Sequence, residues 1–322
     1  MRLWPYSAIA HARTTGVLAP CARSCFRAFV LMYYVAASPQ LSWSTATTPV
    51  DTPYTVTSFV NLSMDEPIPD LSTDEAWEQW GRRDPYFGVF TNPKFRRAAI
   101  NDDARSEFFR SGETDVQHVL ATIRKHIDPQ FLPAKILDFG CGVGRVVVAF
   151  APLAQEVVGL DVSVSMLEEA RRNCDERQLY NVRLLQSDDC LSNVSDTFDL
   201  IYSGIVFQHI PVARGRTIFG NLLQRLRPGG VAAIHLTYSK AHFAATHGIA
   251  PPSSPSPVTA ALAIPEGVDP QIQMNPYHMN EILFLMQTGG VGQCHLEFTD
   301  HGGEMGVVLY FSVPHVASAS PT

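Results

Sequence analysis

Along residues 135–313, short continuous apolar runs alternate with segments in which apolar residues recur at helical spacing. Short apolar runs predict buried strands at 135–139, 156–160, 182–186, 198–203 and 231–238. Between these runs, apolar residues recur every three or four positions. This spacing predicts helices at about 144–153 and 212–226, and one that begins at the capping box Ser165-x-x-Glu168. Strands that alternate with helices favour an α/β fold, a mostly parallel sheet with helices on both faces.

The pattern changes after residue 238. Residues 239–276 interrupt it with a loop that has four prolines between positions 251 and 257. The turn signal Arg227-Pro-Gly-Gly230 precedes the strand before this loop. A helix at 279–287 and strands at 295–299 and 307–313 are predicted to complete the chain, followed by a frayed tail.

Upstream of the sheet, residues 64–134 are predicted to form a helical cap. Apolar residues recur at helical spacing from Val116 to Ile127, and Thr114-x-x-Gln117 has the pattern of a capping box at the start of this helix. The aromatic residues before it are interpreted as core, because buried aromatic side chains mostly pack. They are Tyr86, Phe87, Phe90, Phe108 and Phe109.

Residues 1–63 differ in composition from the rest of the chain. They contain no acidic residue before Asp51, and Ala, Ser, Thr and Pro are frequent. Two interpretations stay open: a disordered extension upstream of Met64, or a targeting segment around the apolar run 28–37, which is too short to cross a bilayer. The predicted organisation is an extension at 1–63, a cap at 64–134, a ligand-binding domain at 135–315 with an insert at 239–276, and a tail at 316–322.

Charge and cysteine content exclude some classes of partner. The net charge is −7 and Lys and Arg form no long block, which disfavours a nucleic-acid surface. The six cysteines include no C-x-x-C pair, so we expect reduced thiols and a cytoplasmic location. The eleven histidines show no spacing of the H-E-x-x-H kind, and no metal site is predicted.

A glycine-rich turn joins the first predicted strand to the first helix. It has the pattern Asp138-x-Gly140-x-Gly142-x-Gly144. Glycine can adopt positive φ and lets a ligand approach the backbone closely, while the following helix start offers unpaired N–H groups. The spacing fits neither the dinucleotide pattern G-x-G-x-x-G nor the phosphate loop G-x-x-x-x-G-K-[ST].

The turn resembles motif I of the class I S-adenosylmethionine (SAM) dependent methyltransferases. Further landmarks follow in the family's order: Asp161 ends the second strand, Asp188 follows the third, 198–203 matches the motif IV region and 227–230 the turn before strand five. The resemblance implies a Rossmann-like, seven-stranded sheet whose last strand is antiparallel. It also implies SAM as cofactor and transfer of its methyl group to an acceptor, for which we expect a small molecule.

Roles for single residues are implied by the same resemblance. Asp161 is placed to accept hydrogen bonds from the ribose hydroxyls. Asp188, or its neighbour Asp189, is placed to accept a hydrogen bond from the adenine amino group. Met166 packs either on adenine or in the core, and Asp138, with the backbone at Gly140 and Ser203, faces the methionine part. The expected cofactor-binding residues are Asp138, Gly140, Cys141, Gly142, Gly144, Asp161, Val162, Met166, Asp188, Asp189 and Ser203.

His209 is the candidate general base, because it follows the fourth strand and imidazole titrates near neutral pH. A base is needed only where the methyl acceptor must lose a proton, and a structural role for His209 stays open. Two other functions also remain: a SAM-binding regulator or scaffold without methyl transfer, and a nicotinamide-dependent oxidoreductase, which the glycine spacing disfavours. Neither the acceptor nor the oligomeric state follows from the sequence.

Overall fold

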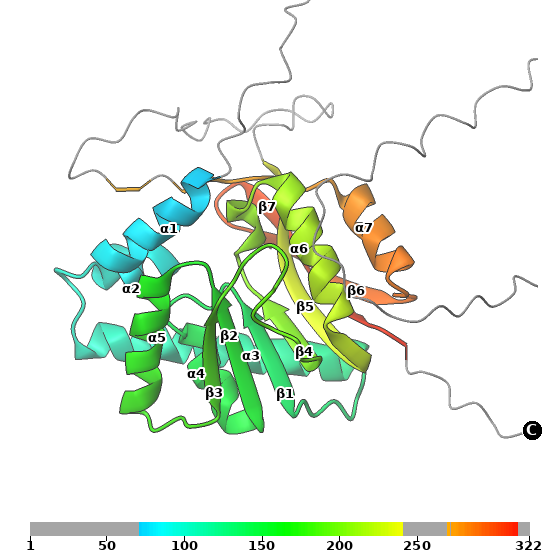
Figure 1. Ribbon diagram of the computed structural model, residues 1–322, viewed down its shortest axis with the longest axis horizontal. Helices are drawn as coiled ribbons and strands as arrows, with labels where there is room; N and C mark the ends of the chain where they lie inside the picture. The colour runs from blue at the N-terminus through cyan, green and yellow to red at the C-terminus, as the bar shows by residue number, and fades with distance from the viewer. Residues whose placement is uncertain (1–70, 241–268, 271, 315–322) are drawn as a thin grey trace, which may run out of the picture. The chain divides into compact units, whose positions relative to one another are not determined.

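The computed structural model describes residues 71–240, 269–270 and 272–314. The predicted extension, most of the insert and the tail therefore lie outside the described residues. The described strands form one sheet (Figure 1), in the order β3-β2-β1-β4-β5-β7-β6. They are β1 (Lys135–Phe139), β2 (Glu156–Asp161), β3 (Val182–Gln186), β4 (Phe198–Ser203), β5 (Leu226–Lys240), β6 (Cys294–Asp300) and β7 (Glu304–Ser312).

The direction of the strands confirms the predicted sheet. Strands β1 to β5 pair in parallel with their neighbours, whereas β7 runs antiparallel to both β5 and β6. Every residue of β4 is buried. A strand covered on both faces needs a continuous apolar run rather than an alternating one. This is why continuous apolar runs in the sequence predicted these strands.

Helices cover both faces of the sheet (Figure 1). On one face lie α3 (Asp102–His126), α4 (Arg145–Phe150) and α5 (Val164–Glu176), and on the other α6 (Val212–Gln224) and α7 (Met279–Thr288). Side chains of β1 alternate between the two cores: Ile136 packs with the first set of helices, and Leu137 and Phe139 with the second. No helix among the described residues is long and apolar enough to cross a membrane.

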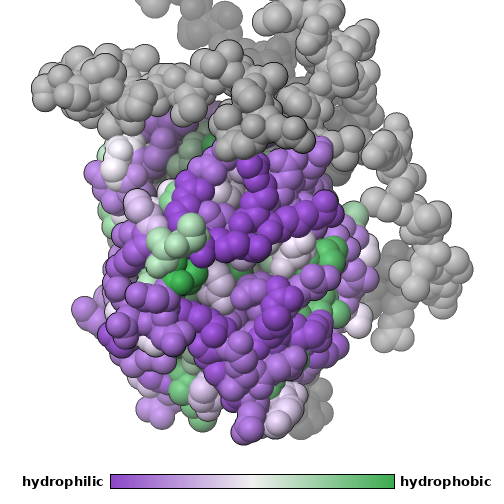
Figure 2. Space-filling view, turned by 90° about the vertical axis from the view of Figure 1, so that its left-hand side faces the viewer, coloured by the Kyte–Doolittle hydropathy of each residue, from purple (hydrophilic) through white to green (hydrophobic). Residues whose placement is uncertain are grey.

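Three short elements precede α3 and pack with it around an aromatic cluster. They are α1 (Leu71–Arg83), α2 (Pro85–Val89) and the 3-10 turn η1 (Pro93–Phe95); two further 3-10 turns are η2 (Ala151–Leu153) and η3 (Phe207–His209). The cluster is buried under a surface on which hydrophilic residues predominate (Figure 2). Of the five aromatic residues interpreted as core, four are buried, but Phe90 is 43% exposed, so that interpretation was wrong for Phe90.

Helix α3 begins earlier than predicted. Its N-cap is Asn101, whose side chain accepts from Ala104 N, and the helix continues unbroken through Thr114. The capping box at Thr114 was therefore wrong, and the Thr114 hydroxyl donates instead to the carbonyl of Arg110. The helix continues because its buried side chains face α4, where Gly112 gives the closest approach: a Cβ there would lie 2.3 Å from the Arg145 carbonyl oxygen.

Two other local predictions also need correction. Ser163, not Ser165, caps α5 by accepting from Met166 N, while the Ser165 hydroxyl donates to Glu78 of α1. Residues 227–230 do not form a separate turn but belong to β5, which is irregular there, with Gly229 at a φ of 77°. Long-range partners override the local signal in both cases.

Two helix glycines provide a matched test of the α3–α4 contact. Gly112→Ala forces a Cβ against backbone and is expected to lower the free energy of unfolding by about 1–3 kcal/mol. Gly220→Ala in α6 meets nothing within 4 Å and is expected to raise it by about 0.5–1 kcal/mol. Urea unfolding measures both, and a Gly112→Ala protein as stable as the parent would contradict the packing described.

Candidate functional site

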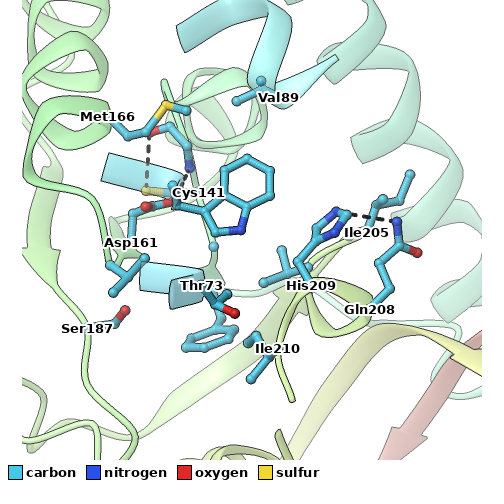
Figure 3. A pocket seen from close by; sticks show the side chains of 18 of the residues that line it. Thr73, Val89, Cys141, Asp161, Met166, Ser187, Ile205, Gln208, His209 and Ile210 are labelled. Carbon is cyan, nitrogen blue, oxygen red and sulfur yellow. Dashed lines mark hydrogen bonds between the residues drawn. The ribbon is translucent and has the colours of Figure 1, made fainter. Parts of the chain in front are cut away.

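A cavity of about 540 Å³ opens at the carboxyl ends of the parallel strands, beneath α1. Ligands of open α/β sheets bind at this edge, where the chain passes from strand to helix. Figure 3 shows Asp161 and Ser187 on one side of the cavity, and Ile205, Gln208 and His209 on the other. The cavity thus connects the acids after β2 and β3 with the loop after β4.

The glycine turn forms the floor of the cavity. Gly140 and Gly142 have φ of 77° and 52°, and an added Cβ would lie 2.4 Å from Val206 and 2.5 Å from Val89, respectively. The backbone N–H groups of Gly140 and Cys141 donate to the Leu160 carbonyl, which ties the turn to β2. Glycine is required here by both conformation and space, and the backbone is left open to a ligand.

Asp161 links this turn to the next one. One carboxylate oxygen accepts from Gly142 N at 2.8 Å, and the other from Ser163 N at 2.9 Å. Burial raises the pKa of Asp161 to about 6, although these hydrogen bonds act in the opposite direction. The acid predicted at the end of β2 therefore lines the cavity and also holds its floor.

Asp138 is the more deeply buried acid, at 2% exposure, and its Oδ2 has no hydrogen-bond partner in the structure. Burial raises its pKa to about 7; the Arg145 guanidinium lowers it and the Asp161 carboxylate raises it further. A buried carboxylate without a partner is unfavourable, so a cationic or hydrogen-bond-donating group in the cavity would be stabilised beside it.

The two acids after β3 behave differently. Asp188 is exposed, and its Oδ1 accepts from Cys190 N and Ser192 N, which lowers its pKa despite partial burial. Asp189 accepts from Arg214 of α6, at 2.8 Å for the shortest contact. Both acids line the cavity. In the contacts described, Asp189 pairs with a cationic side chain and Asp188 does not.

Helix α1 closes the cavity and is held at two points. Near its start, the carboxylate of Asp74 accepts two hydrogen bonds of 3.0 Å from Arg214, the same guanidinium that binds Asp189. Further along, Glu78 accepts from Ser163 Oγ, Ser165 N and Ser165 Oγ at the start of α5, and these bonds lower its pKa to about 2 against the effect of burial. The sequence did not indicate these contacts, because the partners lie more than 80 residues apart.

His209 lies opposite Asp161, against Trp77 of α1, with ring centroids 5.0 Å apart. Its Nδ1 is 2.8 Å from the Gln273 carbonyl oxygen, and its Nε2 is 3.4 Å from the side-chain amide nitrogen of Gln208. Thr237 donates to the other end of that amide, at 2.7 Å. Burial lowers the pKa of His209 to about 4, so its imidazole is neutral at pH 7.

The remaining predicted residues divide into two groups. Cys141, Val162 and Met166 line the cavity, and Met166 also packs in the aromatic cluster. Gly144 and Ser203 do not line it: Gly144 is the left-handed N-cap of α4, and Ser203 Oγ donates to the Phe139 carbonyl. The described cysteines are all free, and the described residues contain no group of three ligands suited to a metal ion.

Comparison with known proteins assigns this region to a family. Residues 136–230 match the methyltransferase domain family. Over 144 residues the chain is 31% identical to a malonyl-[acyl-carrier protein] O-methyltransferase of Salmonella typhimurium, covering 42% of this chain and 54% of the relative. Over 136 residues it is 28% identical to a ubiquinone biosynthesis O-methyltransferase of Coxiella burnetii, covering 41% and 57%. The chain thus spans about half the length of the curated relatives it matches.

A solved structure shows the same fold. The magnesium protoporphyrin IX methyltransferase of Synechocystis, crystallised with bound S-adenosylhomocysteine, superposes with a TM-score of 0.52 at 16% identity. The match covers 74% of this chain and 97% of that protein. The shared architecture extends beyond the domain that the family comparison matches.

Removal of Arg214 is expected to release α1. In Arg214→Met, Asp74 and Asp189 face each other without the guanidinium between them, and amide hydrogens of α1 should exchange about tenfold faster. Arg216→Met is the matched control, because Arg216 lies on the same helix but pairs with Glu281 of α7. Hydrogen exchange by mass spectrometry distinguishes the two variants. Unchanged exchange in α1 of Arg214→Met would contradict the conclusion that Arg214 holds this helix.

The raised pKa of Asp138 predicts a dependence of stability on pH. From about pH 4 to pH 7 the folded protein holds a proton that the unfolded chain has released, so the free energy of unfolding falls as pH rises. Asp138→Asn cannot ionise and should be more stable than the parent at pH 8 by about 1–3 kcal/mol, with no such gain at pH 4.5. Urea unfolding at both values tests this; Asp175→Asn, on the exposed face of α5, is the control. Equal gains at both values would exclude the mechanism.

Proposed function

Because this chain carries a class I, SAM-dependent methyltransferase domain, we propose that it transfers a methyl group from SAM to a small-molecule acceptor. The observation that carries the proposal is a pair of carboxylates in the cavity, the buried Asp138 and the partly exposed Asp161, beside a glycine turn that leaves room for a ligand. SAM brings an ammonium group, which would supply a donor to the unpartnered Oδ2 of Asp138, and two ribose hydroxyls that can donate to Asp161.

The residues of the cavity fit this cofactor. Asp161 would accept from the ribose hydroxyls while keeping the turn in place through Gly142 N. The unpartnered Oδ2 of Asp138 would face the ammonium group, which favours the ionised carboxylate. Val162, Ser187 and Asp188 would enclose the adenine, with Asp188 available to accept from its amino group because Asp189 is bound to Arg214.

SAM supplies a methyl group on a cationic sulfur. The chain's own contribution is to bind the two reactants in line and to exclude water, and for a displacement at carbon such positioning accounts for much of the rate enhancement. Helix α1 covers the cavity, and its Trp77 lines the cavity with its ring 5.0 Å from that of His209. The cavity continues past the acids to His209, which supports methyl transfer over a purely regulatory cofactor site.

A small molecule is the proposed acceptor. The curated relatives, named for malonyl-[acyl-carrier protein], trans-aconitate and ubiquinone biosynthesis, favour a small-molecule group as the site of methylation. The negative net charge gives no support to a nucleic-acid acceptor. His209 is the proposed group for proton transfer at the acceptor.

Calorimetry with SAM and S-adenosylhomocysteine tests the proposal. Asp161→Ala is expected to weaken both ligands at least about tenfold, because a carboxylate that accepts two hydroxyls is lost. Asp175→Ala, exposed on α5, should leave both affinities unchanged. Thermal unfolding of Asp161→Ala checks that the turn still folds. Failure of the parent protein to bind either ligand would overturn the proposed function.

A further inference from the structure

Ile205 has a backbone conformation that is unusual for its type. Its φ is 58°, in the left-handed region that β-branched residues rarely adopt. The strain coincides with exposure: Ile205 is 44% exposed, lines the cavity and lies beside Gln208 (Figure 3). Strain of this kind, about 1–3 kcal/mol, persists where the surrounding structure enforces it, commonly at ligand sites. The strained residue here presents an apolar side chain to the cavity.

The surroundings of His209 are apolar as well. Val206 and Ile210 come from the same loop after β4, and Ile272 and Met274 flank Gln273, whose carbonyl binds the histidine. The Gln208 amide and the imidazole are polar groups at this end, held by Thr237 and by Gln273, respectively, and the lining of the cavity also includes His301. This end of the cavity therefore suits an apolar molecule that carries one hydrogen-bonding group.

The charges that line the cavity disfavour an anionic acceptor. The described lining contains five aspartates and two arginines. Both arginines are engaged by carboxylates: Arg145 pairs with Asp115 at 2.7 Å, and Arg214 binds Asp74 and Asp189. A carboxylate acceptor would have to enter without an uncommitted cationic partner among these residues, which is costly in a buried site.

The hydrogen bonds of His209 define which nitrogen carries its proton. A carbonyl oxygen can only accept, so Nδ1 bears the hydrogen and donates to Gln273. The neutral ring then keeps a lone pair on Nε2. The Gln208 amide donates to that lone pair over a long 3.4 Å, with its orientation fixed because its oxygen accepts from Thr237. An acceptor hydroxyl can replace this weak contact.

We propose that the methyl acceptor is a neutral, largely apolar molecule with an acidic hydroxyl group, a phenol or an enol, whose proton passes to His209. The inference rests on the proposed function. The acceptor oxygen forms a bond to the methyl carbon, the carbon–sulfur bond breaks with its electron pair going to sulfur, and the hydroxyl proton goes to Nε2 of His209. His209 then releases that proton to solvent.

The strength of the base explains why the hydroxyl must be acidic. Burial lowers the pKa of His209 to about 4. Burial also lowers the pKa of His235 of β5 to about 4, and the imidazoles of His301 and His209 lower it in the same direction. A base of this strength is free of its proton at pH 7 but accepts a proton weakly. A phenol or enol oxygen matches it better than an alkyl alcohol, because less driving force is needed to transfer the proton.

The chemical nature of the product tests the acceptor class. The full-length protein is incubated with methyl-labelled SAM and a small-molecule extract of the source organism, and the labelled products are treated with mild alkali. Methyl ethers survive, whereas methyl esters release labelled methanol. An alkali-stable ether, identified by mass spectrometry, is the expected product; a labelled ester or an N-methyl product would overturn the inference.

The pH dependence of a variant tests the role of His209. In His209→Gln, the acceptor must ionise in solution first, so the rate should fall about a hundredfold or more at pH 7 and rise about tenfold per pH unit. The parent rate should be nearly constant from pH 6 to 8. His118→Gln is the control and should follow the parent, because His118 lies on α3 and pairs with Glu297 of β6. A His209→Gln rate that is lowered equally at every pH would indicate a structural role only.

A binding measurement separates this inference from methyl transfer itself. The ligand-free protein is titrated with 2-naphthol and 2-naphthoate, which share one apolar scaffold. Binding of naphthol at least about tenfold tighter supports the inference, and equal or weaker binding of naphthol would contradict it. Failure of the parent protein to bind SAM would instead overturn the proposed function. The two results can be told apart, because naphthol binding is measured without the cofactor.

Discussion

The carboxylate of Asp161 is the contact on which the rest of the site depends. It accepts from Gly142 N in the turn after β1 and from Ser163 N in the turn after β2, and so fixes two loops to one another. The floor of the cavity and the N-cap of α5 share this anchor, since Ser163 also caps that helix. A side chain that supports its own loops cannot move far, which suits a residue that must present both oxygens to a ligand.

The position of α1 over the cavity depends on the same part of the structure. Glu78 of α1 binds Ser163 and Ser165, the residues that follow the Asp161 turn. The other end of α1 is joined through Arg214 to Asp189 after β3. Helix α1 is therefore fixed to the loops after two adjacent strands, β2 and β3, and Trp77, which lies between the two fixed points, lines the cavity.

The fold and the acids could be predicted from the sequence, because strand period and strand ends are local signals. The alternate glycines and Asp138 were recognised by their spacing, and Asp161 and Asp188 by their places after strands together with the resemblance to the methyltransferases. Contacts between distant segments could not be predicted: Asp74 and Arg214 lie 140 residues apart, and each looks like an ordinary surface charge. The pattern around His209 did place that residue at the cavity, but not the tautomer that Gln273 imposes.

The position of α1 over the cavity and the raised pKa values of Asp138 and Asp161 are two aspects of one arrangement. Asp138 is buried and Asp161 lies in the covered cavity, and burial is the first cause of both raised pKa values. Covering two carboxylates is unfavourable, so the position of α1 needs independent stabilisation, which Arg214 and Glu78 supply outside the acid pair. A cationic ligand would offset that penalty. The cover of α1 also keeps water from the space between Asp161 and His209, where the two reactants would meet.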